Sequence, residues 1–67
     1  MELYEIFKKN PENIFSGNEL IDSFSNVFYE IIRDNTYALI KEKIIIDTTE
    51  NCNAKYKNKT FKFSPKK

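Results

Sequence analysis

The amino-acid sequence predicts one α+β domain, spanning residues 1–67, in which helices precede a C-terminal β-hairpin. Three observations predict it. A helix-capping motif begins at Ser16, an amphipathic stretch begins near Asn26, and the run Ile44–Ile46 is β-branched throughout. With 40% hydrophobic residues, one Gly and two Pro, the chain has the composition of an ordered globular domain with a small core.

The stretch Glu2–Asn10 has the pattern of a short amphipathic helix. Leu3, Ile6 and Phe7 recur at helical spacing, and acidic residues come first and lysines last, an order that the helix dipole favours. Pro11 limits this helix, because the residue before a proline is pushed out of the α conformation and the proline has no N–H to donate. The chain is therefore expected to leave the helix just before this proline.

An apolar pair and a capping box follow. We expect Ile14 and Phe15 to be buried and to form a short strand. In the capping box, the Ser16 side chain accepts a helical N–H, and the Glu19 side chain reaches back to the N–H of Ser16. The motif predicts a second helix that starts near Gly17.

A cluster of turn-forming residues separates this helix from the next. Ser23, Ser25 and Asn26 compete for backbone hydrogen bonds, which favours a turn between two helices. Because the cluster contains no Gly, one continuous helix over residues 17–34 also fits the sequence.

A third helix that begins near Asn26 would turn one apolar face to the core. Asn35 interrupts that face, so two outcomes fit. Either the helix continues to about Lys41 with Asn35 hydrogen-bonded inside, or it ends near Arg33. The residues of the predicted apolar face are Phe28, Ile31, Ile32 and Leu39, with Ala38 at its margin.

A β-hairpin is predicted after the third helix. Ile44–Ile46 favours the first strand, and residues 47–53 have no apolar period and are expected to form a loop. Ala54–Ser64 is the candidate for the second strand, in which two phenylalanines face one side and Lys62 the other.

Three lysines conflict with one regular second strand. Lys55, Lys57 and Lys59 share the alternation of the two phenylalanines, so a regular strand would point ammonium groups and phenyl rings the same way. Two arrangements remove the conflict. Either the lysine-bearing end projects into solvent beyond the core, or a two-residue turn at Asn58 and Lys59 places Tyr56 on a separate small hairpin.

The composition argues against catalysis. The chain has no His, and its single Cys52 has no second Cys with which to form a zinc pair or a disulfide. A single Gly excludes a Gly-rich phosphate loop. We therefore expect no enzyme activity, no metal and no cofactor, and an exposed, unreactive thiol at Cys52. The N-terminal residues contain no apolar segment for secretion or membrane insertion, so a cytoplasmic or nuclear protein is expected.

The net charge of +1 conceals a dipolar distribution. Residues 1–34 contain seven acidic and three basic residues, whereas residues 35–67 contain eight lysines and three acidic residues. The C-terminal half is therefore expected to meet any polyanion, although charges scattered for solubility explain the same counts.

Two groups of side chains are candidates for binding nucleic acid. In the first group, Tyr29, Arg33 and Tyr37 form a line at four-residue spacing. Arg can pair with guanine edges or phosphates, and Tyr hydroxyls can contact phosphates. The structural alternative is that the two rings pack over neighbouring elements and that Arg33 pairs with Glu30 or Glu42.

The second group is basic and lies mainly in the predicted hairpin. A lysine-rich hairpin can neutralise backbone phosphates, and a solvated lysine-rich edge that prevents strand aggregation explains the same residues. Together, the predicted nucleic-acid-binding residues are Tyr29, Arg33, Tyr37, Lys41, Lys55, Lys57, Lys59 and Lys62.

The order of the predicted elements resembles that of the winged helix-turn-helix superfamily. The stretches that carry the resemblance are Ser16–Phe24 for helix two, Asn26–Lys41 for the recognition helix, and Ile44–Ile46 and Thr60–Phe63 for the wing. The family implies three helices with a C-terminal β-hairpin wing. It also implies binding of double-stranded DNA, with the third helix in the major groove and the wing on the backbone. A small transcriptional regulator, as a monomer or a homodimer, would fit this description.

A protein partner is the rival prediction, because many winged helices bind proteins instead of DNA. The acidic N-terminal half and the many aromatic residues favour a protein interface. Under this prediction the chain is a protein-binding inhibitor or adaptor of the small viral or phage type.

Overall fold

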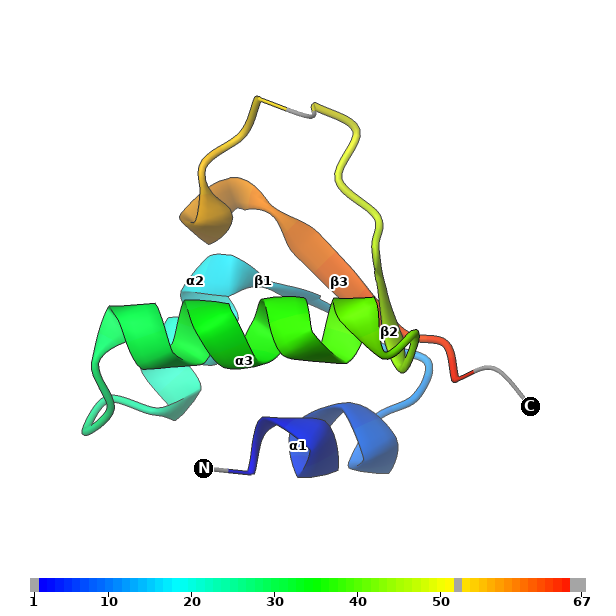
Figure 1. Ribbon diagram of the computed structural model, residues 1–67, viewed down its shortest axis with the longest axis horizontal. Helices are drawn as coiled ribbons and strands as arrows, with labels where there is room; N and C mark the ends of the chain where they lie inside the picture. Colours follow the sequence, from blue (N-terminus) through cyan, green and yellow to red (C-terminus); the bar gives the residue numbers. More distant parts are fainter. Residues whose placement is uncertain (1, 52, 66–67) are drawn as a thin grey trace.

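The computed structural model describes residues 2–51 and 53–65, which fold into three α-helices and a three-stranded antiparallel sheet (Figure 1). This confirms the predicted α+β class. Figure 1 shows α3 crossing the middle of the molecule, α1 beneath it, and the loop between β2 and η1 rising away from the helices. In chain order the elements are α1 (Leu3–Lys9), β1 (Ile14–Ser16), α2 (Gly17–Ser23), α3 (Tyr29–Lys41), β2 (Ile45–Asp47), the 3₁₀ turn η1 (Tyr56–Asn58) and β3 (Thr60–Phe63).

The first helix ends where the sequence predicts. The N–H of Asn10 donates to the carbonyl of Phe7 at 3.2 Å, and the N–H of Asn13 donates to the carbonyl of Asn10 at 3.1 Å. These bonds close a turn around Pro11, which carries the chain out of the α conformation. The helix buries Leu3 and Phe7 against the rest of the domain.

The capping box at Ser16 is confirmed. The Ser16 hydroxyl accepts the N–H of Glu19 at 3.1 Å, and the Glu19 carboxylate accepts the N–H of Ser16 at 3.3 Å. The resulting helix, α2, ends at Ser23, and α3 begins at Tyr29. One continuous helix over residues 17–34 is therefore wrong, and the predicted turn is confirmed.

The sheet has the order β1-β3-β2, with both pairings antiparallel. Phe15 of β1 lies opposite Phe61 of β3. Its ring centroid is 5.3 Å from that of Phe7, and the two rings are edge-on to each other. The prediction that Ile14 is buried is wrong, because alternation along the strand turns its side chain to the opposite face, where it is 55% exposed. The first strand of the predicted hairpin begins at Ile45, one residue after the predicted start at Ile44.

The predicted second strand is wrong over its first half. Tyr56–Asn58 forms a 3₁₀ turn, and β3 begins only at Thr60. Tyr56 is only 4% exposed and belongs to the core, so it does not lie on a separate small hairpin. The turn takes Lys55 and Lys57 out of the strand alternation and leaves both exposed, which resolves the conflict between lysines and phenylalanines.

The core face of α3 matches the predicted one at Ile32 and Leu39 and differs from it at its other positions. Ile32 and Thr36 are buried, whereas Phe28 is 78% and Ile31 45% exposed. Phe28 precedes the helix as its N-cap residue, and the helix is turned so that Thr36 faces the core. The helix continues to Lys41, as one of the two predicted outcomes requires.

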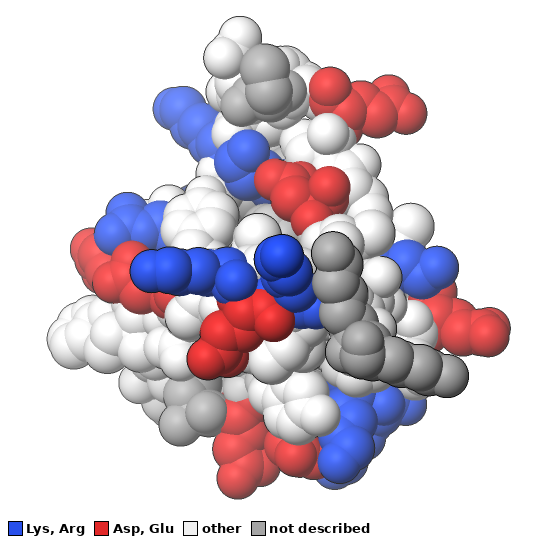
Figure 2. Space-filling model, turned by 45° about the vertical axis from the view of Figure 1, so that its right-hand side comes forward, with Lys and Arg blue, Asp and Glu red and all other residues white. Residues whose placement is uncertain are grey.

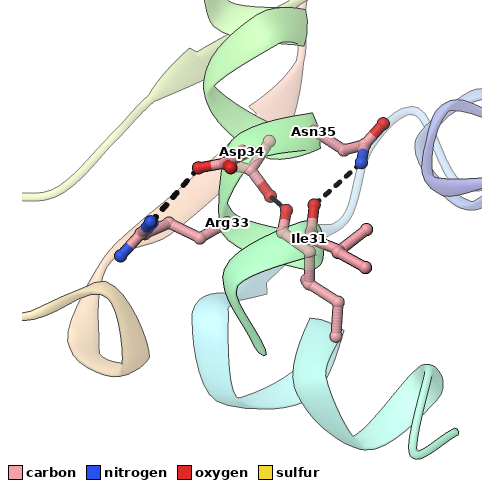
Figure 3. A network of polar contacts seen from close by, with 6 residues as sticks. Ile31, Arg33, Asp34 and Asn35 are labelled. Atoms are coloured by element: carbon pink, nitrogen blue, oxygen red, sulfur yellow. Dashed lines mark hydrogen bonds and ion pairs between the residues drawn. The ribbon is translucent and has the colours of Figure 1, made fainter. Parts of the chain in front are cut away.

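Asn35 lies on the outside of α3 and not within the apolar face. Its side-chain amide donates to the carbonyl of Ile31 at 2.8 Å, as Figure 3 shows. This bond satisfies the amide within the helix, so Asn35 does not interrupt α3. The polar residue that α3 buries is Thr36.

A Schellman motif ends α3, with a lysine in the left-handed position. Lys43 has a φ of 62°. Its N–H donates to the carbonyl of Ile40 at 3.0 Å, and the N–H of Ile44 donates to the carbonyl of Leu39 at 3.0 Å. This turn directs the chain from the helix into β2, and glycine is the residue that usually occupies its left-handed position.

Replacing Lys43 with Gly is expected to raise the free energy of unfolding by about 0.5–1 kcal/mol. Glycine adopts positive φ without the Cβ strain, and this gain exceeds the extra entropy of the unfolded chain. Urea denaturation of the wild type, Lys43→Gly and Lys43→Ala measures the effect. Ala keeps the Cβ, so a gain in Lys43→Ala equal to that in Lys43→Gly would contradict the explanation.

Candidate nucleic-acid interface

Tyr56 connects η1 to α3 through a buried contact with Thr36, close to several of the residues predicted to bind nucleic acid. The Thr36 hydroxyl donates to the carbonyl of Ile32 at 2.8 Å and lies 2.8 Å from the Tyr56 hydroxyl. Because Thr36 has one hydroxyl proton, the Tyr56 phenol must be the donor in their contact. Burial raises the pKa of Tyr56, against the opposing effect of the Thr36 hydrogen bond, so the phenol keeps the proton that it donates.

A glycine allows η1 to lie directly on α2. The N–H of Gly17 donates to the carbonyl of Lys59 at 2.8 Å. A Cβ built on Gly17 would overlap the carbonyl group of Tyr56 and would lie 2.9 Å from the Cδ2 atom of the same residue. The close approach of these two backbones fixes the position of the lysines that flank Tyr56.

The two predicted tyrosines of α3 lie on either side of Tyr56. The ring centroids of Tyr29 and Tyr37 are 5.6 Å and 6.2 Å from that of Tyr56, both in edge-on geometry. The line of residues at four-residue spacing drifts by about 40° per step around the helix. Tyr29, Tyr37 and Lys41 are exposed, and Arg33 is half-buried. The two rings pack over a neighbouring element, as the structural alternative predicts.

Arg33 is held by two neighbours. Its guanidinium lies 5.5 Å from the centre of the Tyr29 ring, and its Nη2 atom lies 3.3 Å from Oδ1 of Asp34 (Figure 3). The hydrogen bond to Asp34 raises the pKa of Arg33. Asp34 is thus the partner, and not Glu30 or Glu42, and part of the positive charge of Arg33 is already matched.

Lys55 and Lys57 lie beside the line on α3. Together with Ile21, Tyr29 and Tyr56 they line a shallow cavity of about 550 Å³. Five of the eight predicted residues therefore gather around Tyr56. We name this region the Tyr56 surface; it consists of Tyr29, Arg33, Tyr37, Lys55 and Lys57.

The remaining lysines of the predicted interface lie elsewhere. The Nζ atom of Lys59 lies 3.7 Å from Oδ2 of Asp47. Asp47 ends β2 and Lys59 directly precedes β3, so the pair lies where the loop joins the sheet. Lys62 lies in the middle strand, opposite Ile14 on one side and Ile46 on the other, and all three side chains point away from the core. Lys41 is exposed in the last turn of α3.

The pair of Asp47 and Lys59 is expected to stabilise the domain above about pH 4 and to lose its effect in acid. Partial burial alone would raise the pKa of Asp47, but hydrogen bonds from Thr49 and the charge of Lys59 outweigh it and lower the pKa. A carboxyl with a lowered folded-state pKa contributes stability above its unfolded pKa and loses it as the pH falls through the folded value. Thermal melts of the wild type and Asp47→Asn should differ at about pH 7 and converge below about pH 3. An equal difference at both pH values would contradict the role of the carboxylate.

The surface charge is mixed. Figure 2 shows lysine and arginine side chains interspersed with acidic ones over the face that it presents, and no continuous basic field on that face. On α3 itself Glu30 and Asp34 are exposed close to Arg33. The basic character of the Tyr56 surface is therefore local.

Sequence reasoning missed Tyr56 and Thr36 as the residues that hold the candidate interface together. Thr36 sits at helical spacing from Ile32, a signal that the hydroxyl obscured, and nothing local distinguishes Tyr56 from an exposed tyrosine.

Cys52, expected to be an exposed thiol, lies outside the residues described. No helix formed by residues 2–51 or 53–65 is long and apolar enough to cross a membrane. No protein-family model, curated protein or solved structure matches the chain.

Proposed function

We propose that this chain is a winged-helix-like domain that binds double-stranded DNA through the Tyr56 surface, as a small cytoplasmic or nuclear regulator. The observation that carries the proposal is the gathering of Arg33, Lys55 and Lys57 on one side, beside the aromatic rings of α3. The order of helices and strands and the β1-β3-β2 sheet support it, since a winged helix has this layout.

In this proposal α3 enters the major groove, and η1 meets the adjacent backbone. Lys55 and Lys57 neutralise phosphates, and the Tyr29 and Tyr37 hydroxyls are within reach of the same strand. Lys41 extends the contact at the far end of the helix. Lys59 and Lys62 take no part, because the first is paired with Asp47 and the second points from the outer face of the sheet.

Salt-dependent binding to a mixed-sequence duplex, followed by fluorescence anisotropy, tests the proposal. Lys55→Ala/Lys57→Ala is expected to weaken binding about tenfold at low salt and to lower the slope of log K against log salt by about two. Lys59→Ala/Lys62→Ala removes the same charge and serves as the matched control, with little change expected in the slope. Absence of binding at low salt would refute DNA binding. An equal loss of slope in the two double variants would refute the assignment to the Tyr56 surface.

A protein partner is the second candidate function, and one observation favours it. Phe28 and Ile31 expose apolar side chains at the start of α3, next to the carboxylates of Glu30 and Asp34. An exposed aromatic residue with acidic neighbours is typical of a protein interface and is unfavourable next to phosphates. Under this candidate, Phe28→Ser abolishes partner binding and leaves the thermal stability unchanged.

A further inference from the structure

The outer face of the sheet is apolar and basic. Ile14 and Ile46 are 55% and 46% exposed, and the pairing register places Lys62 directly between them. Cross-strand neighbours point to the same face, so the three side chains form one row. Lys43 lies beside the end of this row, because it lines the same shallow cavity as Ile46. We name Ile14, Lys43, Ile46 and Lys62 the sheet face.

The start of α3 is apolar and acidic. Phe28 and Ile31 are three residues apart, and Asp34 follows at the same spacing, with Glu30 exposed beside them. Both contacts of Asp34 with Arg33 use the Oδ1 atom, and 69% of the Asp34 side chain remains exposed. We name Phe28, Glu30, Ile31 and Asp34 the helix face.

The charges on the two faces are largely uncompensated within one molecule. Over residues 2–51 and 53–65 the ion pairs are Arg33–Asp34 and Lys59–Asp47, so neither Lys62 nor Glu30 belongs to one. Figure 1 shows the start of α3 and the strand β2 at opposite ends of the molecule. A single copy therefore cannot bring the helix face onto its own sheet face.

We propose that a second copy of this chain covers these faces, with the helix face of one copy seated on the sheet face of the next. Such a contact buries Phe28 and Ile31 against Ile14 and Ile46 and places acidic side chains opposite Lys62. Opposite charges fix the orientation of an apolar contact and exclude the wrong one. The contact joins two different faces, so each copy keeps one free face and can add a further copy.

The symmetric alternatives are disfavoured by charge. Two sheet faces packed around a two-fold axis would bring Lys62 close to its counterpart, and two helix faces would bring their carboxylates together. The head-to-tail contact avoids both repulsions. The two faces are small, so the association is weak and reversible, in the class of interfaces below the standard size. The proposal does not depend on DNA binding, because neither face includes Lys55 or Lys57.

Sedimentation velocity from about 10 µM to about 1 mM protein, the range suited to a small interface, tests this proposal. The wild type is expected to show a weight-average sedimentation coefficient that rises with concentration. Phe28→Ser, which disables the helix face, and Lys62→Glu, which disables the sheet face, are each expected to weaken association at least about tenfold. Lys9→Glu makes the same charge reversal at an exposed position in neither face and should associate like the wild type. Far-UV circular dichroism establishes that each variant is folded, and Ile46→Thr is a second sheet-face variant that keeps β-branching.

An equimolar mixture of Phe28→Ser and Lys62→Glu gives the decisive measurement. The first variant keeps an intact sheet face and the second an intact helix face, so the mixture is expected to form a 1:1 dimer that grows no further. A monomeric wild type over the whole range would overturn the proposal. Undiminished association of both single variants would also overturn the proposal. A mixture that stays monomeric would overturn it as well, because only a contact between two different faces predicts that the two variants complement each other.

Discussion

Replacing Gly17 with Ala is expected to unfold the domain, with a loss of more than about 3 kcal/mol in the free energy of unfolding. The added Cβ would overlap the backbone carbonyl of Tyr56, and a backbone group cannot rotate aside as a side chain can. Relief requires η1 to separate from α2, which breaks the bond from Gly17 to the Lys59 carbonyl and withdraws Tyr56 from the core.

The sign of this prediction distinguishes it from an effect of helix propensity. Ala is favoured over Gly within a helix by about 1 kcal/mol, so propensity alone predicts a more stable protein. Circular dichroism and urea denaturation of Gly17→Ala measure the effect. Asn18→Ala, at an exposed position one residue further along α2, is the control and should change stability little. A folded Gly17→Ala protein with wild-type stability would show that η1 does not approach α2 so closely.

Replacing Thr36 with Val is expected to lower the free energy of unfolding by about 1–3 kcal/mol. Val has nearly the same shape, but it removes the acceptor for the buried Tyr56 phenol, which is left unsatisfied. Tyr56→Phe removes both the phenol and its need for a partner, so its loss should be smaller, about 1 kcal/mol. In the double variant the two losses should not add.

Urea denaturation of the four proteins in this double-mutant cycle provides the measurement. Thr48→Val is the matched control, because the Thr48 hydroxyl lies 2.7 Å from that of Thr60 in a half-buried site. Water can satisfy Thr60 there after the change, so a loss below about 0.5 kcal/mol is expected. Strict additivity of Thr36→Val and Tyr56→Phe would contradict a direct bond between the two hydroxyls.

Short-range patterns predicted the ends of α1 and the start of α2, whereas α3 begins at Tyr29, three residues after the predicted start near Asn26. The capping box at Ser16 needs only Ser16 and Glu19, and Pro11 ends α1 through its own ring and its missing N–H. The break between α2 and α3 falls at the cluster of turn-forming residues that begins at Ser23, whose hydroxyl donates to the carbonyl of Glu19 at 2.9 Å. Such features depend on residues close in the sequence, so the sequence alone suffices to predict them.

Orientation relative to the core depended on partners that are distant in the sequence. The Thr36 hydroxyl donates within α3 to the Ile32 carbonyl, but it faces the core because it packs against Tyr56, twenty residues later, whose phenol it accepts. Phe28 and Ile31 lie on the exposed side of the helix. The direction of the side chains of β1 depends on its pairing with β3 and not on its own three residues, so the sequence alone does not predict that Ile14 faces outward. The same reasoning applies to the candidate interface. The line on α3 was visible as a pattern, but its contact with η1 required the close approach at Gly17.

The strand β3 follows both of its neighbours in sequence and lies between them in the sheet. Neither β1 nor β2 has a hydrogen-bonded strand partner until Thr60–Phe63 docks, and the pairing of Ile14 with Lys62 closes the long segment from residue 14 to residue 62. Closing so long a segment slows folding compared with forming local helices. Both strand pairings and the burial of Phe61 therefore depend on the same C-terminal strand, and a chain that ended before Thr60 would form no part of this sheet.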